Sequence, residues 1–335
     1  MKCVAIVGAT GAVGQEFRAV LAERRFPAKE YRLLASARSA GQVIPWVDGD
    51  LRVHELTTHS FAGVDLALFS AGGSVSKEYG PIAAKAGAVV VDNSSAFRMD
   101  PTVPLVVPEV NPEAAKAHRG IIANPNCSTI ILVLPLWPLH KANPVVRAVV
   151  STYQAVSGAG ARAITELETQ TRAVLAGGKP QPEIFHVPCA FNVFSHNSAI
   201  GEDGYNQEES KMVFETRKIF AAPEIQIAPT CIRVPVMRAH TESVAVEFKN
   251  PIDENEAREI LSAAPGVKII DDRKANRFPM PLDASGQDDV LVGRIRRDPS
   301  VPGSRGLQFI CSGDQLRKGA ALNAVQIAEL LTAAR

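Results

Sequence analysis

The chain has 335 residues, enough for two domains, and its 46% hydrophobic and 21% charged residues are ordinary for a globular protein. A net charge of +1 with no dense Lys or Arg block gives no reason to expect nucleic acid as a partner. The five cysteines are scattered and form neither a disulfide framework nor a CxxC metal pattern, so we expect no metal and a reducing compartment. No apolar stretch reaches about 18 residues and no signal peptide is found, so we expect a cytoplasmic protein that does not bind membranes.

Strand and helix patterns alternate over the first third of the chain. The continuous apolar run Cys3–Val7 predicts a parallel strand that is covered on both faces. Further strands are predicted at Tyr31–Ala35, Asp65–Phe69 and Ala88–Val91, with a helix near Ser76–Ala86 between the last two. This alternation predicts an α/β domain built on a Rossmann-type, doubly wound parallel sheet with right-handed crossovers.

A glycine-rich turn joins the first strand to the first helix. Its sequence is Gly8-Ala9-Thr10-Gly11-Ala12-Val13-Gly14, in which the first two glycines are separated by two residues instead of the usual one. Between a buried strand and a helix start, such a turn predicts a pyrophosphate cradle, because glycines let the backbone approach and the helix N-terminus faces the anion. The predicted cofactor contacts are Gly8, Thr10, Gly11, Ala12, Val13 and Gly14.

The end of the second strand indicates which dinucleotide binds. NAD sites usually carry an acid there, but this chain has none until Asp48. Arg38 and Ser39 can hold a 2′-phosphate, so the sequence favours NADP over NAD, although Arg38 can also be read as a solvated loop arginine. The small polar loop Ser70-Ala71-Gly72 follows the next strand, at the edge where ligands of such sheets bind.

The segment Asn124-Pro125-Asn126-Cys127-Ser128-Thr129 places a cysteine at a junction between a loop and a helix. Asn126 is a good N-cap residue, so Cys127 is expected in the first turn of an apolar helix, where backbone N–H groups favour the thiolate. A thiolate is the nucleophile of acyl chemistry. The alternative is a buried cysteine that acts as a small hydrophobic residue.

In the rest of the chain, strands outnumber close strand–helix repeats. Strands are predicted at 145–155, 242–248, 290–294 and 308–311, and helices near 161–175, 206–220 and 254–263. This mixture predicts a second, α+β domain with a mixed sheet. Asp314 is the N-cap candidate of a last helix, and the Gly- and Pro-rich stretch 177–204 predicts a long functional or interface loop.

Sequence blocks spread from residue 4 to residue 331 resemble those of aspartate-β-semialdehyde dehydrogenase: GATGAVG, SARSAG, DNSSAFRMD, VPLVVPEVN, NPNCSTI, STYQAVSGAG, CIRVPV and LRKGAALNAVQIAEL. The resemblance implies NADP-dependent reductive dephosphorylation of L-aspartyl-4-phosphate to L-aspartate-4-semialdehyde through a thioester on Cys127. That step leads towards lysine, threonine, methionine and diaminopimelate. The resemblance also implies an NADP-binding domain of residues 1–126 that is completed by a C-terminal helix of residues 314–335, and a catalytic and dimerisation domain of residues 127–313. Family members are dimers or tetramers, and we expect a homodimer.

The resemblance also implies roles for single residues. The catalytic set is Cys127 as nucleophile, Gln154 as the residue that orients the substrate, and His240 as the acid/base residue. The substrate-binding set adds Arg98 and Lys211 for phosphate, Arg233 for the α-carboxylate, Glu208 near the α-amino group, and Asn126. Further residues implied near the cofactor are Ser157 and Gly158 of the second domain and Gln315 at the start of the C-terminal helix.

Other interpretations compete with these roles. Without the resemblance, Glu208 and Lys211 would be an exposed helix ion pair, and His240 a structural histidine. The fold and nucleophile also suit an N-acetyl-γ-glutamyl-phosphate reductase, but its acetylated amine would not need Glu208 as a partner. A catalytically silent NADP-binding protein is the third reading.

Three features of the sequence are not explained by the strand pattern or by the resemblance. Arg233 and His240 are an odd number of residues apart, so along one unbroken strand they would point to opposite faces, and the chain must bend between them if both reach one pocket. The family often has a glutamine where Ile131 stands. Pro135 is an unexpected breaker within the helix that follows Cys127.

Overall fold

The computed structural model describes residues 1–47 and 49–333. Their contacts divide the chain into two compact units, Met1–Asn126 with Gly319–Arg335, and Cys127–Lys318. Residues 314–318, which the sequence assigns to the C-terminal helix of the first domain, thus group with the second unit. Asp48 and residues 334–335 of that predicted helix lie outside the described residues. No helix among the described residues has the length and apolar character needed to cross a bilayer.

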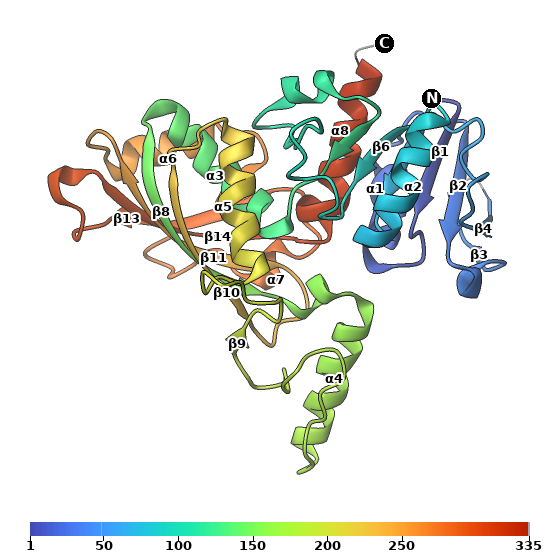
Figure 1. The fold of residues 1–335 in the computed structure, drawn as a ribbon. Coiled ribbons are helices and arrows are strands. Elements are labelled where there is room, and N and C mark those ends of the chain that lie inside the picture. The colour runs from blue at the N-terminus through green and yellow to red at the C-terminus, as the bar shows by residue number, and fades with distance from the viewer. Residues whose placement is uncertain (48, 334–335) are drawn as a thin grey trace. The chain divides into compact units, whose positions relative to one another are not determined.

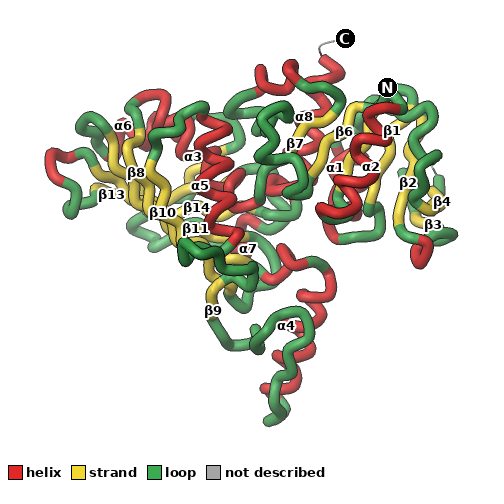
Figure 2. Tube along the Cα trace, in the orientation of Figure 1, coloured by secondary structure: helices red, strands yellow, loops and turns green. Residues whose placement is uncertain are grey.

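The first unit is built on a seven-stranded sheet (Figures 1 and 2). In spatial order its strands are β3 (Val43–Ile44), β4 (Leu51–Glu55), β2 (Glu30–Ala35), β1 (Cys3–Val7), β5 (Leu66–Phe69), β6 (Val89–Asp92) and β7 (Ile121–Ala123). All neighbours are parallel except β3, which runs antiparallel to β4. The chain steps outward from β1 to β2 and then back to β5, which confirms the predicted doubly wound sheet.

Helices cover both faces of this sheet, as the continuous apolar run of β1 requires. Val4 and Ile6 pack in one cluster with residues of α1 (Ala12–Glu23) and α8 (Leu322–Ala333). The alternate residues of β1 pack in a second cluster with residues of α2 (Gly73–Lys85). Because successive strand residues face opposite sides, a strand covered on both faces has no polar position, and this is the pattern seen in the sequence.

The second unit contains a mixed seven-stranded sheet, which confirms the predicted second domain. In spatial order its strands are β12 (Val267–Ile269), β13 (Val290–Arg297), β14 (Gly306–Gly313), β11 (His240–Phe248), β8 (Val145–Gln154), β10 (Gln226–Arg233) and β9 (Phe194–Ser195). Its α-helices are α3 (Cys127–Ala142), α4 (Ala161–Leu175), α5 (Gln207–Phe220), α6 (Glu254–Ser262) and α7 (Pro281–Ala284). Helix α3 contacts α5 and α6 and packs on the central strands.

The stretch 177–204 is a long loop that folds against α4, and together they form a lobe that extends from one end of the sheet (Figure 1). Its small core includes Leu167 of α4 together with Phe185 and Cys189 of the loop. The loop then returns to the sheet as the short edge strand β9, which the sequence did not predict.

Helix α3 continues through Pro135 and Pro138. Pro135 has no N–H to donate to the carbonyl of Ile131, four residues earlier. The thiol of Cys311 approaches that carbonyl instead, at 4.0 Å, from strand β14. Ile131 is fully buried, and a Cβ on Gly313 would lie 2.9 Å from its Cγ1, so strand and helix are in close contact here.

The last helical segment begins as the sequence indicates but continues irregularly. Asp314 Oδ1 accepts the backbone N–H groups of Leu316 and Arg317 at 3.0 and 3.1 Å, as an N-cap does. The next turn, Arg317–Ala321, is π-helical, and the regular α-helix starts only at Leu322.

We expect Gly14→Ala to destabilise the first unit strongly. The new Cβ would lie 2.2 Å from the carbonyl oxygen of Gly8 and 2.7 Å from the carbonyl carbon of Ala9, so the backbone must move. A loss of about 3 kcal/mol in unfolding free energy is expected. Gly11→Ala is the matched control, because its Cβ would meet the Gly8 oxygen at 3.4 Å, an ordinary contact. Urea unfolding of both variants tests this, and equal losses would contradict it.

Candidate functional site

Three of the predicted site residues lie in one row at the end of the sheet of the second unit. Gln154 ends the central strand β8, and Arg233, which ends the parallel strand β10, pairs with it directly. His240 begins β11 on the other side of β8, where the next residue, Thr241, pairs with Tyr153. Gln154, Arg233 and His240 are all buried. The register of three strands therefore brings together an amide, a guanidinium and an imidazole.

Arg233 and His240 lie on two different strands, so the chain does bend between them, as both side chains require to reach one site. The chain leaves β10 after Arg233 and enters β11 at His240, and the preceding Ala239 has a left-handed φ of 69°. A Cβ on the exposed residue Gly158 would lie 3.3 Å from His240 Nε2 and 3.5 Å from Arg233 NH1. Both side chains thus reach the same point beneath Gly158, and any larger residue there would cover them.

His240 is fully buried, and its hydrogen bond fixes its tautomer. The backbone N–H of Ala155 donates to Nδ1 at 3.0 Å, so the proton of the neutral ring resides on Nε2. Nε2 has no hydrogen-bond partner among the described residues. Burial, reinforced by the cationic Arg233, holds the pKa of His240 well below its usual value. The ring is therefore a neutral donor at Nε2.

Arg233 is a buried cation that contacts only neutral acceptors among the described residues. NH1 donates to the carbonyl of Ala155 at 2.6 Å, and NH2 lies 2.9 Å from Nε2 of His196. Nε has no partner among the described residues, and the guanidinium carbon lies 5.5 Å from the ring centre of Phe185. Burial lowers the pKa of Arg233, while the negative charges of Glu208 and of a Cys127 thiolate oppose that shift. An anion is the ligand this group can best accept.

Gln154 is oriented by two acceptors. Its Nε2 donates to the hydroxyl of Ser128 at 2.8 Å and to Glu208 Oε1 at 3.1 Å, which leaves Oε1 of the amide without a partner among the described residues. Glu208 also accepts from Lys211 Nζ at 3.0 Å, and its carboxylate is buried whereas the lysine is half-buried. Gln154, Glu208 and Lys211 thus form one connected chain of polar groups.

Cys127 is the first residue of α3, and its side chain is half-buried. It lies directly before Ser128, the hydroxyl that accepts from Gln154, so the helix start and the row of site residues are connected. Asn126 precedes it and is buried.

Ser157 and Gly158 lie in the turn Val156–Ala159, directly after β8. Both ends of the Gln315 amide are engaged by the protein, because Nε2 donates to Ser157 Oγ and Oε1 accepts the N–H of Ala239 at 2.8 Å. Gln315 therefore fixes both the turn that carries Gly158 and the left-handed residue before His240.

The glycine turn of the first unit is tightly packed. Gly8 has φ of 85°, and a Cβ there would lie 2.3 Å from the carbonyl oxygen of Ser70, so only glycine fits. Ala71 follows Ser70, and Gly72, with φ of 89°, caps α2. The turn leads into α1 through Ala12 and Val13, as a phosphate cradle requires.

The residues predicted to bind the 2′-phosphate lie beside this turn. Thr10 Oγ1 donates to Ser39 Oγ at 3.4 Å, and Ser39 is buried in the short helix Ala37–Ser39. Arg38 is exposed and forms no hydrogen bond or ion pair with the described residues.

Arg98 lies in the first unit, whereas Lys211, its predicted partner in phosphate binding, lies in the second. The guanidinium of Arg98 is buried and donates to the carbonyls of Asn124 and Asn93 at 2.9 and 2.7 Å. These two loops follow β7 and β6 at the carboxyl edge of the parallel sheet, the edge where such sheets bind ligands.

Comparison with known proteins places these residues in a family. Residues 3–118 match the family model described as semialdehyde dehydrogenase, NAD binding domain, and residues 136–318 match semialdehyde dehydrogenase, dimerisation domain. The aspartate-semialdehyde dehydrogenase of Synechocystis sp. is 57% identical over 328 residues, which are 98% of this chain and 96% of that protein. That of Aquifex aeolicus is 53% identical over 98% of this chain and 97% of that protein. The chain belongs to the aspartate-semialdehyde dehydrogenase family.

Comparison with solved structures supports the same family. Aspartate semialdehyde dehydrogenase II from Vibrio cholerae, complexed with ASA, matches with a TM-score of 0.96 and 46% identity over 99% of this chain and 98% of that one. The enzyme from Candida albicans with NADP matches with a TM-score of 0.77 and 25% identity over 99% and 98% of the two chains. The resemblance found in the sequence is confirmed, and the first unit is the NAD(P)-binding domain of an aspartate-semialdehyde dehydrogenase family member.

Sequence reasoning missed two titratable residues of this family member, the buried Glu242 and the half-buried His196. Glu242 is two residues beyond His240 on β11 and is fully buried, with its Oε2 4.0 Å from the thiol of Cys311. The period of two along a strand could have placed it on the His240 face. His196, which contacts Arg233, carried no comparable signal, because its position depends on the unpredicted edge strand β9.

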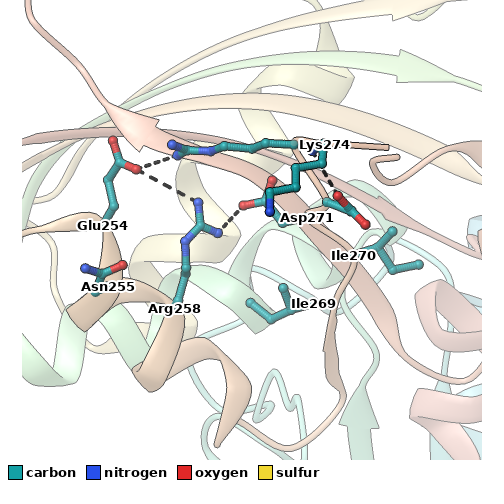
Figure 3. Close-up of a pocket in the computed structure, with 9 residues that line it drawn as sticks. Glu254, Asn255, Arg258, Ile269, Ile270, Asp271 and Lys274 are labelled. Atoms are coloured by element: carbon teal, nitrogen blue, oxygen red, sulfur yellow. Dashed lines mark hydrogen bonds and ion pairs between the residues drawn. The ribbon is translucent and has the colours of Figure 1, made fainter. Parts of the chain in front are cut away.

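A hollow of about 730 Å³ lies elsewhere on the second unit, between α6 and the segment after β12 (Figure 3). Figure 3 shows Arg258 between Glu254 and Asp271, with which it forms ion pairs. Its charged groups largely neutralise one another, and none of the predicted site residues lines it.

We expect Glu242→Gln to change how stability depends on pH. Burial, and then the negative charge of Glu208, hold the pKa of Glu242 well above its ordinary 4.5. The folded protein keeps this proton whereas the unfolded chain releases it, so rising pH destabilises the wild type by about 1.4 kcal/mol per pH unit from this group, until the folded-state pKa is reached. The glutamine variant lacks this titration.

The measurement is the difference in unfolding free energy between Glu242→Gln and the wild type at pH 6 and pH 8. The unfolding free energy of the variant should rise relative to that of the wild type as the pH rises. A difference that is constant across this range would show that Glu242 is ionised in the folded protein.

Proposed function

We propose that the chain catalyses the NADP-dependent reductive dephosphorylation of L-aspartyl-4-phosphate to L-aspartate-4-semialdehyde, as its family implies. The observation that supports this most is the buried Arg233, which has no carboxylate partner among the described residues and lies beside Gln154 and Glu208. Cys127 belongs to the same unit. The product would serve the synthesis of lysine, threonine, methionine and diaminopimelate.

The charges of the site match those of this substrate. Arg233 offers a planar fork for the α-carboxylate, and Glu208 offers a carboxylate for the α-ammonium. Lys211, which is paired with Glu208, and Arg98 in the first unit are proposed to hold the phosphate, with Asn126 as a further contact. Such placement holds the reacting carbonyl near the thiol.

The covalent steps follow from Cys127. Its thiolate attacks the acyl carbon, the carbon–oxygen bond to phosphate breaks, and phosphate leaves a thioester on sulfur. The nicotinamide, when bound, supplies the hydride that reduces this thioester. The carbon–sulfur bond then breaks and releases the aldehyde and the thiolate. His240 is the proposed acid at this site, and Gln154 orients the bound acyl group.

The tautomer of His240 refines its role. Nε2 carries the ring proton, so it can donate to the carbonyl oxygen as negative charge develops there, in the manner of an oxyanion hole. Taking up a proton at Nε2 would require the ring proton to move to Nδ1, which faces the N–H of Ala155. The geometry therefore favours donation over proton abstraction.

The first unit suits the dinucleotide. Gly8 and Gly14 leave no room for a side chain in the turn before α1, as close approach of a pyrophosphate requires. NADP is preferred in this proposal because the exposed guanidinium of Arg38 and the hydroxyl of Ser39 lie next to the turn, with no acid in Ser36–Gly41. The match to a dimerisation domain supports a homodimer, which sedimentation equilibrium would test.

One assay tests the proposed reaction in the reverse direction. Phosphate-dependent reduction of NADP⁺ should occur with aspartate semialdehyde and be far slower with N-acetylglutamate semialdehyde, whose acetylated nitrogen carries no charge for Glu208. Equal rates with the two aldehydes would contradict the proposal that aspartate semialdehyde is the substrate.

We expect Cys127→Ser to abolish turnover and to leave NADP binding nearly intact, because a hydroxyl is a far poorer nucleophile than a thiolate at neutral pH. Cys189→Ser is the matched control, since a serine there can still donate to Gln170 as the thiol does. Turnover would be followed by NADP⁺ reduction and binding by fluorescence titration. Near-normal turnover in Cys127→Ser would exclude the covalent mechanism.

We expect the double variant Arg38→Ala, Ser39→Ala to weaken NADP binding far more than NAD binding, by about 100-fold against less than about threefold. Only NADP carries the 2′-phosphate that these side chains would hold. Arg52→Ala, which removes another exposed arginine of the same sheet, should change neither affinity. If both cofactors weaken equally in the double variant, the loop has a structural role only.

A further inference from the structure

His196 is held against Arg233 by the backbone. Strand β9 pairs antiparallel with the end of β10, with Phe194 opposite Arg233. The N–H of His196 then donates to the carbonyl of Cys231 at 2.9 Å, which extends this pairing by one more bond. The ring is thereby fixed with Nε2 2.9 Å from NH2 of Arg233.

This contact requires a neutral imidazole. A guanidinium can only donate, so Nε2 must accept and the ring proton belongs on Nδ1. The backbone N–H of Ser198 also points at Nδ1, from 3.2 Å, but the guanidinium contact is shorter and carries charge, so it sets the tautomer. Nδ1 can then donate to the hydroxyl of Ser198 at 3.1 Å.

The chain of hydrogen bonds continues to the start of α5. The hydroxyl of Ser198 donates to Asn206, the N-cap of α5, at 3.4 Å, and accepts the backbone N–H of Glu208 at 3.2 Å. His196 and Ser198 therefore connect the guanidinium of Arg233 with the helix turn that carries Glu208. These are the two groups proposed to hold the carboxylate and the ammonium of the substrate.

The electrostatics agree with this geometry. Burial is the main cause that lowers the pKa of His196 to about 4; the negative charge of Glu208 opposes this shift, and the positive charges of Arg233 and Lys211 add to it. A neutral partner leaves the positive charge of Arg233 available for an anion. A carboxylate in the place of His196 would neutralise that charge and would compete with the ligand.

Resting on the proposed function, we propose that His196 is a positioning residue and determines specificity for the α-carboxylate: it holds the guanidinium of Arg233 as a neutral acceptor and, through Ser198, fixes it relative to Glu208.

Three substitutions of His196 test the proposal in the full-length enzyme. His196→Leu removes the acceptor and should lower kcat/KM for aspartate semialdehyde about 30-fold, mainly through KM. His196→Gln keeps a neutral acceptor and donor and should stay within about threefold of the wild type. His196→Glu, which has the same shape as glutamine, should lose at least as much as the leucine variant. His186→Leu, an exposed histidine of the same loop, is the control and should not change the kinetics.

A second aldehyde separates positioning from general damage. 3-Aminopropanal carries the ammonium and the aldehyde but no carboxylate, so Arg233 has nothing to hold. His196→Leu should change its kcat/KM by less than about twofold. Equal losses with both aldehydes, wild-type kinetics in His196→Leu, or a glutamate variant as active as the glutamine variant would each overturn the proposal.

Two further measurements cover the remaining outcomes. If 3-aminopropanal reacts too slowly, the double variant His196→Leu, Arg233→Lys is compared with Arg233→Lys alone. The added His196→Leu should lower kcat/KM for aspartate semialdehyde by less than about threefold, since its effect passes through Arg233. If the losses of the two single variants multiply in full, the proposal is refuted. If His196→Leu does not fold, the glutamine and glutamate variants decide. A wild type without turnover of aspartate semialdehyde would refute the proposed function alone, and ¹⁵N NMR of the His196 ring would then test the contact, with an Nε2-protonated ring overturning it.

Discussion

A buried guanidinium with no ion-pair partner among the described residues is the constraint on which the site depends. Arg233 is 2% exposed, and its hydrogen bonds go to neutral acceptors from Ala155 and the loop that carries His196. Burying a charge without an opposite charge costs several kcal/mol, which neutral acceptors offset only in part. The same cation helps to keep the neighbouring imidazoles of His196 and His240 neutral. An incoming carboxylate relieves this cost, so ligand binding and folding stability are coupled here.

The backbone brings distant parts of the sequence into this arrangement by strand register. β8 lies between its parallel neighbour β10 and its antiparallel neighbour β11, so the ends of three strands meet at one edge. Glu209 then fixes α5 against the sheet, because one carboxylate oxygen accepts the N–H of Asn206 and the other accepts the N–H of Cys231 on β10. A single capping residue thus sets both the start of α5 and its distance from the strand that ends in Arg233.

Local patterns predicted the parts of the structure that depend on local physics. The apolar run of β1 and the glycine turn after it predicted the doubly wound sheet, since burial on both faces and close packing each require particular residues at consecutive positions. The spacing of Arg233 and His240 showed that the chain must bend between them if they share a site, but no local signal showed where the strand ends. The tautomer of His240 and the contact of His196 with Arg233 could not be predicted from the sequence either. Both depend on which backbone groups lie opposite in the folded sheet, and this is set by long-range register.

The division of the first unit has a consequence for synthesis. Val325 and Ile327 of α8 are fully buried in the same core as Val4 and Ile6 of β1. A ribosome makes the whole of residues 127–318 between these two sets of core residues. At about 5–20 residues per second, this interval lasts roughly 10–40 s. During that time one apolar face of the first sheet lacks α8, one of the two helices that cover it in the finished protein. The unit that starts first on the ribosome is therefore the last to be completed.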